Sequence, residues 1–125
     1  MYCKIYVTKK NIGSNELSTS ISLLIGGNQT NNIYVEKEGY SIEVDANDEY
    51  DAIKEKHFPD GFLFFPFTIE IDIYDNIKKE TAAQEVGGIL KFLWENGYTA
   101  IASCDFEDLL PENGGYKSKN IPWIE

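Results

Sequence analysis

The sequence is poor in the residues that carry most enzymatic chemistry. It holds one histidine, His57, and two cysteines, Cys3 and Cys104, and it contains no arginine. A lone histidine is usually structural or solvated, because histidine catalysis needs a positioned partner. The histidine and the cysteines also lack the paired spacing of zinc ligands. We therefore expect a protein that is not an enzyme and that uses neither a metal nor a cofactor.

Long hydrophobic runs are missing too. The longest candidate, Phe62 to Phe67, is far shorter than a membrane span and contains Pro66. The stretch Met1 to Val7 is too short and too polar for a signal peptide. Two free thiols suit a reducing compartment, although a Cys3–Cys104 disulfide stays open if their strands are neighbours. We expect a cytoplasmic protein with no membrane partner.

Positive charge is scarce, and negative charge is abundant. Eleven lysines stand against 21 acidic residues, which gives a net charge of −10 at pH 7. Such a chain repels nucleic acid and attracts basic surfaces. The lysines are scattered along the chain, so we expect no nucleic-acid partner. Acidity can also serve solubility alone, and the charge by itself does not decide between these interpretations.

The chain has enough apolar material for one domain, covering residues 1–125. Its 125 residues are 42% hydrophobic and 14% aromatic, which is typical of a folded protein. Apolar residues in alternation predict an antiparallel sheet with one wet face. The predicted strands are Tyr2–Thr8, Leu17–Ile25, Ile33–Glu36, Tyr40–Ala46, Phe62–Tyr74 and Tyr98–Ser103.

Two details of this sheet depend on aromatic segments. The odd-numbered residues from Leu63 to Ile73 are apolar, which predicts that they form the core face of one long strand. Pro66 cannot donate to a strand ladder, so it indicates an edge position or a bulge. The segment Asp48–Lys56 is open between a short helix, with Tyr50 and Ile53 facing inward, and an irregular crossing loop.

One amphipathic helix is expected near residues 81–96. Thr81 and Gln84 have the spacing of a capping box, and Gly97 is a typical helix stop. Gly87 and Gly88 weaken a helix interior, which we interpret as a close approach of the helix to the sheet. The predicted fold class is α+β, with five or six antiparallel strands and one main helix packed on a face.

The last predicted strand leads into an acidic loop that ends in the pair Gly114 and Gly115. This strand end, with two acids from the Phe62–Tyr74 strand, is our candidate docking face for a basic protein. Its predicted partner-binding residues are Asp105, Glu107, Asp108, Glu112, Glu70 and Asp72. The acidic segment Asp45–Asp51 is a competing place for the same role.

Three segments resemble small bacterial immunity proteins of polymorphic toxin systems. They are Phe62–Asp72, Gly88–Gly97 and Ala102–Tyr116, and together they span under half of the chain. The resemblance implies an antitoxin that binds and blocks a cognate toxin domain, often a nuclease, delivered by a neighbouring cell. A basic toxin surface would suit the acidic charge of this chain.

Two other classes of function stay open. One is a non-catalytic module that assembles only with itself. The other is a small hydrolase that uses two carboxylates, for example Glu70 with Asp105 or Glu107. The first predicts self-association without a ligand, and the second predicts a concave pocket with two facing acids.

Overall fold

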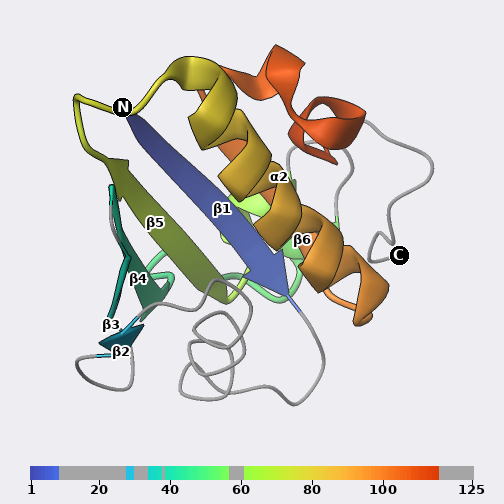
Figure 1. Cartoon of the computed structure of the whole chain (residues 1–125). Helices are drawn as coiled ribbons and strands as arrows, with labels where there is room; N and C mark the ends of the chain where they lie inside the picture. The colour runs from blue at the N-terminus through green and yellow to red at the C-terminus, as the bar shows by residue number, and fades with distance from the viewer. Residues whose placement is uncertain (9–27, 30–33, 38, 57–60, 116–125) are drawn as a thin grey trace.

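The computed structural model describes residues 1–8, 28–29, 34–37, 39–56 and 61–115, which form an α+β fold (Figure 1). One long helix crosses a face of an antiparallel sheet, so the predicted fold class is confirmed. The strands are β1 Tyr2–Thr8, β2 Asn28–Gln29, β3 Tyr34–Lys37, β4 Tyr40–Ala46, β5 Phe67–Ile73 and β6 Thr99–Cys104. The helix is α2 Lys79–Glu95, and four short 3-10 turns are η1 Lys54–Lys56, η2 Gly61–Phe64, η3 Glu107–Leu109 and η4 Pro111–Gly115.

The sheet order places the N-terminal strand β1 between β5 and the edge strand β6. The strands run β2-β3-β4-β5-β1-β6, and every neighbouring pair is antiparallel. Side chains alternate between two faces, as the period of a strand requires. The main core lies between α2 and one face, and its fully buried members include Ile5, Ile69, Ile71, Leu90 and Leu93. The predicted strands Tyr2–Thr8 and Tyr40–Ala46 are confirmed, whereas Leu17–Ile25 and His57 lie outside the described residues.

The predicted long strand from Phe62 is wrong in its first part. Residues 61–64 form η2, and the strand β5 begins only at Phe67. Pro66 directly precedes β5 because it has no N–H to donate to the ladder. β5 pairs with strands on both sides, so Pro66 marks neither an edge strand nor a bulge. Leu63, expected in the core, is 42% exposed.

The segment between β4 and β5 is a crossing loop rather than a helix. Within Asp48–Lys56 a single turn of 3-10 helix forms, at Lys54–Lys56, and Tyr50 and Ile53 are exposed instead of facing inward. Asp51 explains this, because its carboxylate accepts the N–H groups of Ile53 and Lys54 at 2.9 and 3.0 Å. Such local bonds compete with a regular helix.

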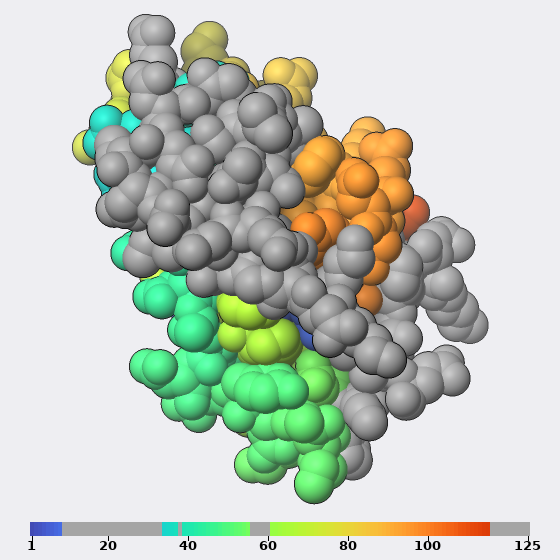
Figure 2. Space-filling view, turned by 90° about the horizontal axis from the view of Figure 1, so that it is seen from below, coloured from blue at the N-terminus to red at the C-terminus, as the bar shows by residue number. Residues whose placement is uncertain are grey.

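The crossing loop covers part of the second face of the sheet. Phe62 and Phe65 pack there against Ile101 of β6 and Tyr6 of β1, in a small second core. Figure 2 shows the loop and the following turn, in green, on the side of the molecule away from α2. Other parts of this face carry polar side chains of β3, β4 and β5.

The sequence predicts the end of α2 correctly but not its start. The helix begins at Lys79 with Lys78 as its N-cap, and no side chain caps it, so the Thr81–Gln84 capping box is wrong. At the other end Gly97 adopts a φ of +84°. The N–H of Tyr98 then donates to the carbonyl of Leu93 at 2.9 Å, which is the Schellman closure. The predicted glycine stop is confirmed.

The glycine pair inside α2 does not serve a close approach to the sheet. A Cβ at Gly87 would lie 3.0 Å from Cδ of Pro111, whereas a Cβ at Gly88 would meet nothing within 4 Å. Gly87 therefore makes room for the turn η4, and that part of our interpretation was wrong. Gly88 has no such steric role in the described part of the chain.

Candidate functional site

The face of the sheet opposite α2 carries a group of acids on three adjacent strands. We define the acidic sheet face as Glu36, Glu43, Asp45, Glu70 and Asp72. The register places Glu43 directly opposite Glu70, and Glu70 directly opposite Lys4 of β1. All five acids are exposed except Glu70, which is half-buried. Among the strand residues that the structure describes, Lys4 is the only base on this face.

A hollow of about 280 Å³ lies at one end of the acidic sheet face. It joins the sheet to the start of the crossing loop. Its lining residues are Lys4, Asp45, Ala46, Asn47, Asp48, Glu49, Thr68 and Glu70. Glu70 comes from the docking face that the sequence predicted, and the acids of residues 45–49 come from the competing segment. The structure therefore brings parts of the two competing sites into one place.

Asn47 lines this hollow and holds the loop that forms part of it. Its side-chain amide donates to the carbonyls of Leu63 and Phe65 at 3.0 and 2.7 Å. Its backbone N–H donates to the carbonyl of Pro66 at 2.8 Å. These bonds tie the loop after β4 to the chain entering β5, so the neighbouring acids Asp48 and Glu49 are held beside the sheet.

Two tyrosines of β1 border the acids. The hydroxyl of Tyr2 donates to the Glu70 carboxylate at 2.5 Å, although Tyr2 as a residue is 46% exposed. Partial burial and this hydrogen bond to an anion raise the pKa of Tyr2 above its usual value, so its O–H stays a donor. The Lys4 ammonium lies 5.2 Å from the centre of the Tyr6 ring, as in a cation–π contact.

The acidic segment after β6 is a separate site. Asp105, Asp108 and Glu112 are exposed, but the Glu107 carboxylate accepts the backbone N–H of Cys104 at 2.9 Å. Glu107 thus has a structural role, because its carboxylate holds the backbone of Cys104, three residues earlier in the chain. Glu112 has a φ of +54°, in the left-handed region.

This segment lies beside α2, on the other side of the sheet from Glu70 and Asp72. Pro111 of η4 rests against Gly87 of the helix. Cβ atoms at Gly114 and Gly115 would lie 3.0 and 2.8 Å from the carbonyl oxygens of β6 residues 102 and 100. The six predicted residues therefore fall into two groups: Glu70 and Asp72 on the acidic sheet face, and the other four next to the helix.

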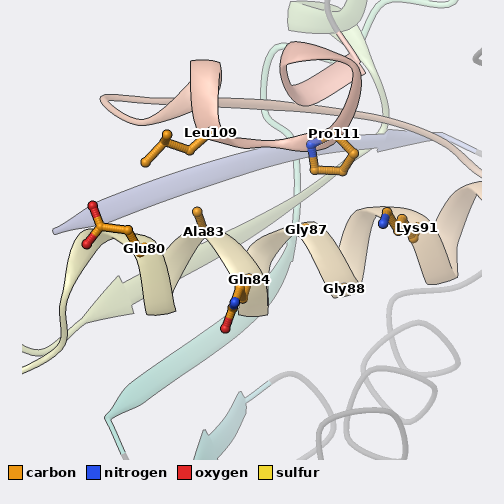
Figure 3. A pocket seen from close by; sticks show the side chains of 8 residues that line it. All are labelled: Glu80, Ala83, Gln84, Gly87, Gly88, Lys91, Leu109 and Pro111. Atoms are coloured by element: carbon orange, nitrogen blue, oxygen red, sulfur yellow. The ribbon is translucent and has the colours of Figure 1, made fainter.

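Sequence reasoning missed a groove between α2 and the turns η3 and η4. It has a volume of about 410 Å³ and is lined by Glu80, Ala83, Gln84, Gly87, Gly88, Lys91, Leu109 and Pro111. Figure 3 shows Leu109 and Pro111 on one side, facing the small residues of the helix. The Gly87–Gly88 pair is the sequence signal for this groove, because both glycines line it and neither serves the predicted approach to the sheet.

Neither a metal centre nor a membrane helix is found among the described residues. No group of three or more histidine, cysteine or acidic side chains there is arranged to hold an ion. No helix in those ranges is long and apolar enough to cross a bilayer. Comparisons with protein-family models, curated proteins and solved structures find no match to the chain. Its function must be argued from its own residues.

Proposed function

We propose that this chain is a non-catalytic cytoplasmic immunity protein that binds and neutralises a cognate toxin domain. The toxin docks a basic surface on the acidic sheet face. The observation that carries the proposal is the alignment of Glu43, Asp45, Glu70 and Asp72 on adjacent strands of the face that α2 leaves open. The resemblance to immunity proteins supplies the class of partner.

The geometry of the sheet favours charge recognition. Neighbouring strands are about 4.8 Å apart, so the carboxylates of β4 and β5 add their fields over a small area. The strands are held by ladders on both sides of β5, so the acids need little ordering when a partner binds. A toxin that grips phosphates, such as a nuclease, presents the basic surface that such a face attracts.

Tyr2 supplies an apolar contact within the charged area. The residue is 46% exposed, and its hydroxyl already donates a hydrogen bond to Glu70. Half-exposed tyrosines often anchor interfaces, because the ring buries area at little entropic cost. Two copies of this chain could not use the same face, since their acids would repel each other. This face therefore does not favour self-association.

Co-expression tests the class of function. The C-terminal domain encoded immediately upstream of this gene should kill cells when expressed alone and should be harmless when this protein is present. The two proteins should also co-purify. If no neighbouring product is toxic, or if none binds this chain, the immunity proposal fails.

Matched charge removal tests the docking face. The double variant Glu43→Gln/Glu70→Gln removes two negative charges from the acidic sheet face and keeps an acceptor for Tyr2. The double variant Asp105→Asn/Asp108→Asn removes two charges from the segment after β6. We expect the first to weaken toxin binding about tenfold or more and to reduce its salt dependence, with little effect of the second. The reverse result would move the docking face to the segment after β6.

A further inference from the structure

The sheet brings the two cysteines of the chain together. Cys3 of β1 and Cys104 of β6 are directly opposite each other in the β1–β6 register. Both carry free thiols; Cys3 is fully buried and Cys104 is half-buried. One residue lies near the start of the chain and the other follows it by about a hundred residues, so only this strand pairing makes them neighbours.

Backbone hydrogen bonds show which kind of cross-strand pair this is. The N–H of Cys104 donates to the Glu107 carboxylate and so points away from β1. On the other side of β1, Met1 and Ile73 exchange both backbone hydrogen bonds, at 2.9 and 2.8 Å. Two residues along, Cys3 therefore directs its own N–H and carbonyl to β5. Cys3 and Cys104 form a non-hydrogen-bonded pair.

Non-hydrogen-bonded pairs are the closer kind in an antiparallel sheet. Their Cα atoms lie about 4.5 Å apart, whereas the hydrogen-bonded kind is separated by about 5.5 Å. Disulfides span Cα distances of roughly 4.4–6.8 Å. The two strands can therefore accept a bond between the sulfurs without moving apart or together.

We propose that Cys3 and Cys104 form a redox-active dithiol site, which a small disulfide such as oxidised glutathione converts reversibly into a cross-strand disulfide. In the first step the Cys104 thiolate attacks a glutathione sulfur, and one glutathione thiolate leaves. Cys3 then attacks the Cys104 sulfur and releases the second glutathione. Two electrons pass from the protein thiols to the glutathione disulfide, and the two protons end on the glutathione thiols.

The order of the two attacks follows from the environment of each sulfur. Hydrogen bonding between the two thiols lowers the pKa of Cys104 and raises that of Cys3. Cys104 is also the more exposed residue and lies at the end of the edge strand β6. A thiolate is the attacking species in exchange, so Cys104 reacts first and Cys3 resolves the mixed disulfide.

The test uses the full chain in buffers of graded reduced and oxidised glutathione. We expect intact-mass measurements to show loss of two hydrogens and thiol titration to fall from two groups to none. The oxidised protein should melt about 10 °C or more higher, because the bond closes a loop of about a hundred residues. Persistence of both thiols at every ratio, or oxidation only in denaturant, would overturn the proposal.

Two single variants test the order of reaction. Cys3→Ala should stop at a stable mixed disulfide on Cys104, and Cys104→Ala should stay unmodified while folded. Equal labelling of both variants, or a covalent dimer of the wild type as main product, would contradict the assigned roles. The wild-type mass and melting data do not depend on either variant. The site is independent of the proposed function, because the acidic sheet face lies on the other side of the sheet.

Discussion

Adjacent glycines in the middle of α2 allow a matched test of the structure. Gly88→Ala should stabilise the protein, because a Cβ there meets nothing within 4 Å and the full helix propensity of alanine is gained. That gain is about 1 kcal/mol. Unfolding entropy is about 2.1 cal/mol/K per residue, or about 0.26 kcal/mol/K for this chain of 125 residues. The melting temperature should therefore rise by about 4 °C.

Gly87→Ala should not share this gain. Its Cβ would lie 3.0 Å from Cδ of Pro111, which is closer than ordinary contact. Pro111 cannot move away easily, because Gly115 of the same turn is seated against the carbonyl of Ala100. Displacing the turn costs about 1 kcal/mol or more, which offsets the gain in helix propensity. We expect a melting temperature at or below that of the wild type.

Thermal and urea unfolding of the two variants, with the wild type beside them, measure the difference. The urea m-values should match, so that any change in midpoint reports stability. Equal stabilisation by both substitutions would refute the contact between η4 and the helix. Destabilisation by Gly88→Ala would show that the exposed side of α2 is covered in the folded protein.

Three further outcomes follow from the same structure. Phe65→Ala empties the small second core and should cost about 3–5 kcal/mol in urea unfolding, whereas an effect below about 1 kcal/mol would mean that the crossing loop does not pack on the sheet. Gly115→Ala places a Cβ 2.8 Å from the Ala100 carbonyl at a φ of +91°, and should cost about 2 kcal/mol or more, with unchanged stability as the contrary result. The raised pKa of Tyr2 means that the folded state holds its proton longer, so wild-type stability should fall as pH rises above 10, and Tyr2→Phe should reduce that slope. An identical slope in both proteins would contradict the Tyr2–Glu70 bond.

The sequence predicts strands well where alternation is not interrupted. Tyr2–Thr8 and Tyr40–Ala46 have the predicted bounds, because alternating apolar residues of each strand pack in the main core. Alternation predicts a strand wrongly at Phe62–Pro66, because the apolar run continues through a proline that cannot donate a hydrogen bond to a strand ladder. The predicted start of α2 is also wrong. Thr81 and Gln84 have the spacing of a capping box, but the helix begins at Lys79, so Thr81 lies inside the helix and does not cap it.

The candidate sites depend on pairings that a sequence does not display. The sequence shows that acidic residues are abundant, but only the strand order shows that they lie on two different sides of the sheet. Glu43 was not among the predicted residues, and it becomes important only because β4 pairs with β5 and sets it opposite Glu70. The meeting of Cys3 and Cys104 likewise requires β1 to lie beside β6.

The Glu43–Glu70 pair gives the strongest support to the proposal that the acidic sheet face binds a partner. Like charges directly opposite each other destabilise an antiparallel sheet, as at this pair. The structure gives neither glutamate an ion pair with a described residue, and the ion pair Lys37–Glu85 joins β3 to the helix instead. Stability alone would favour a lysine or threonine at one of the two positions. Lys4, directly opposite Glu70 on β1, offsets part of this repulsion. A basic partner would supply further positive charge, so the repulsion that weakens the free protein would become attraction in the complex.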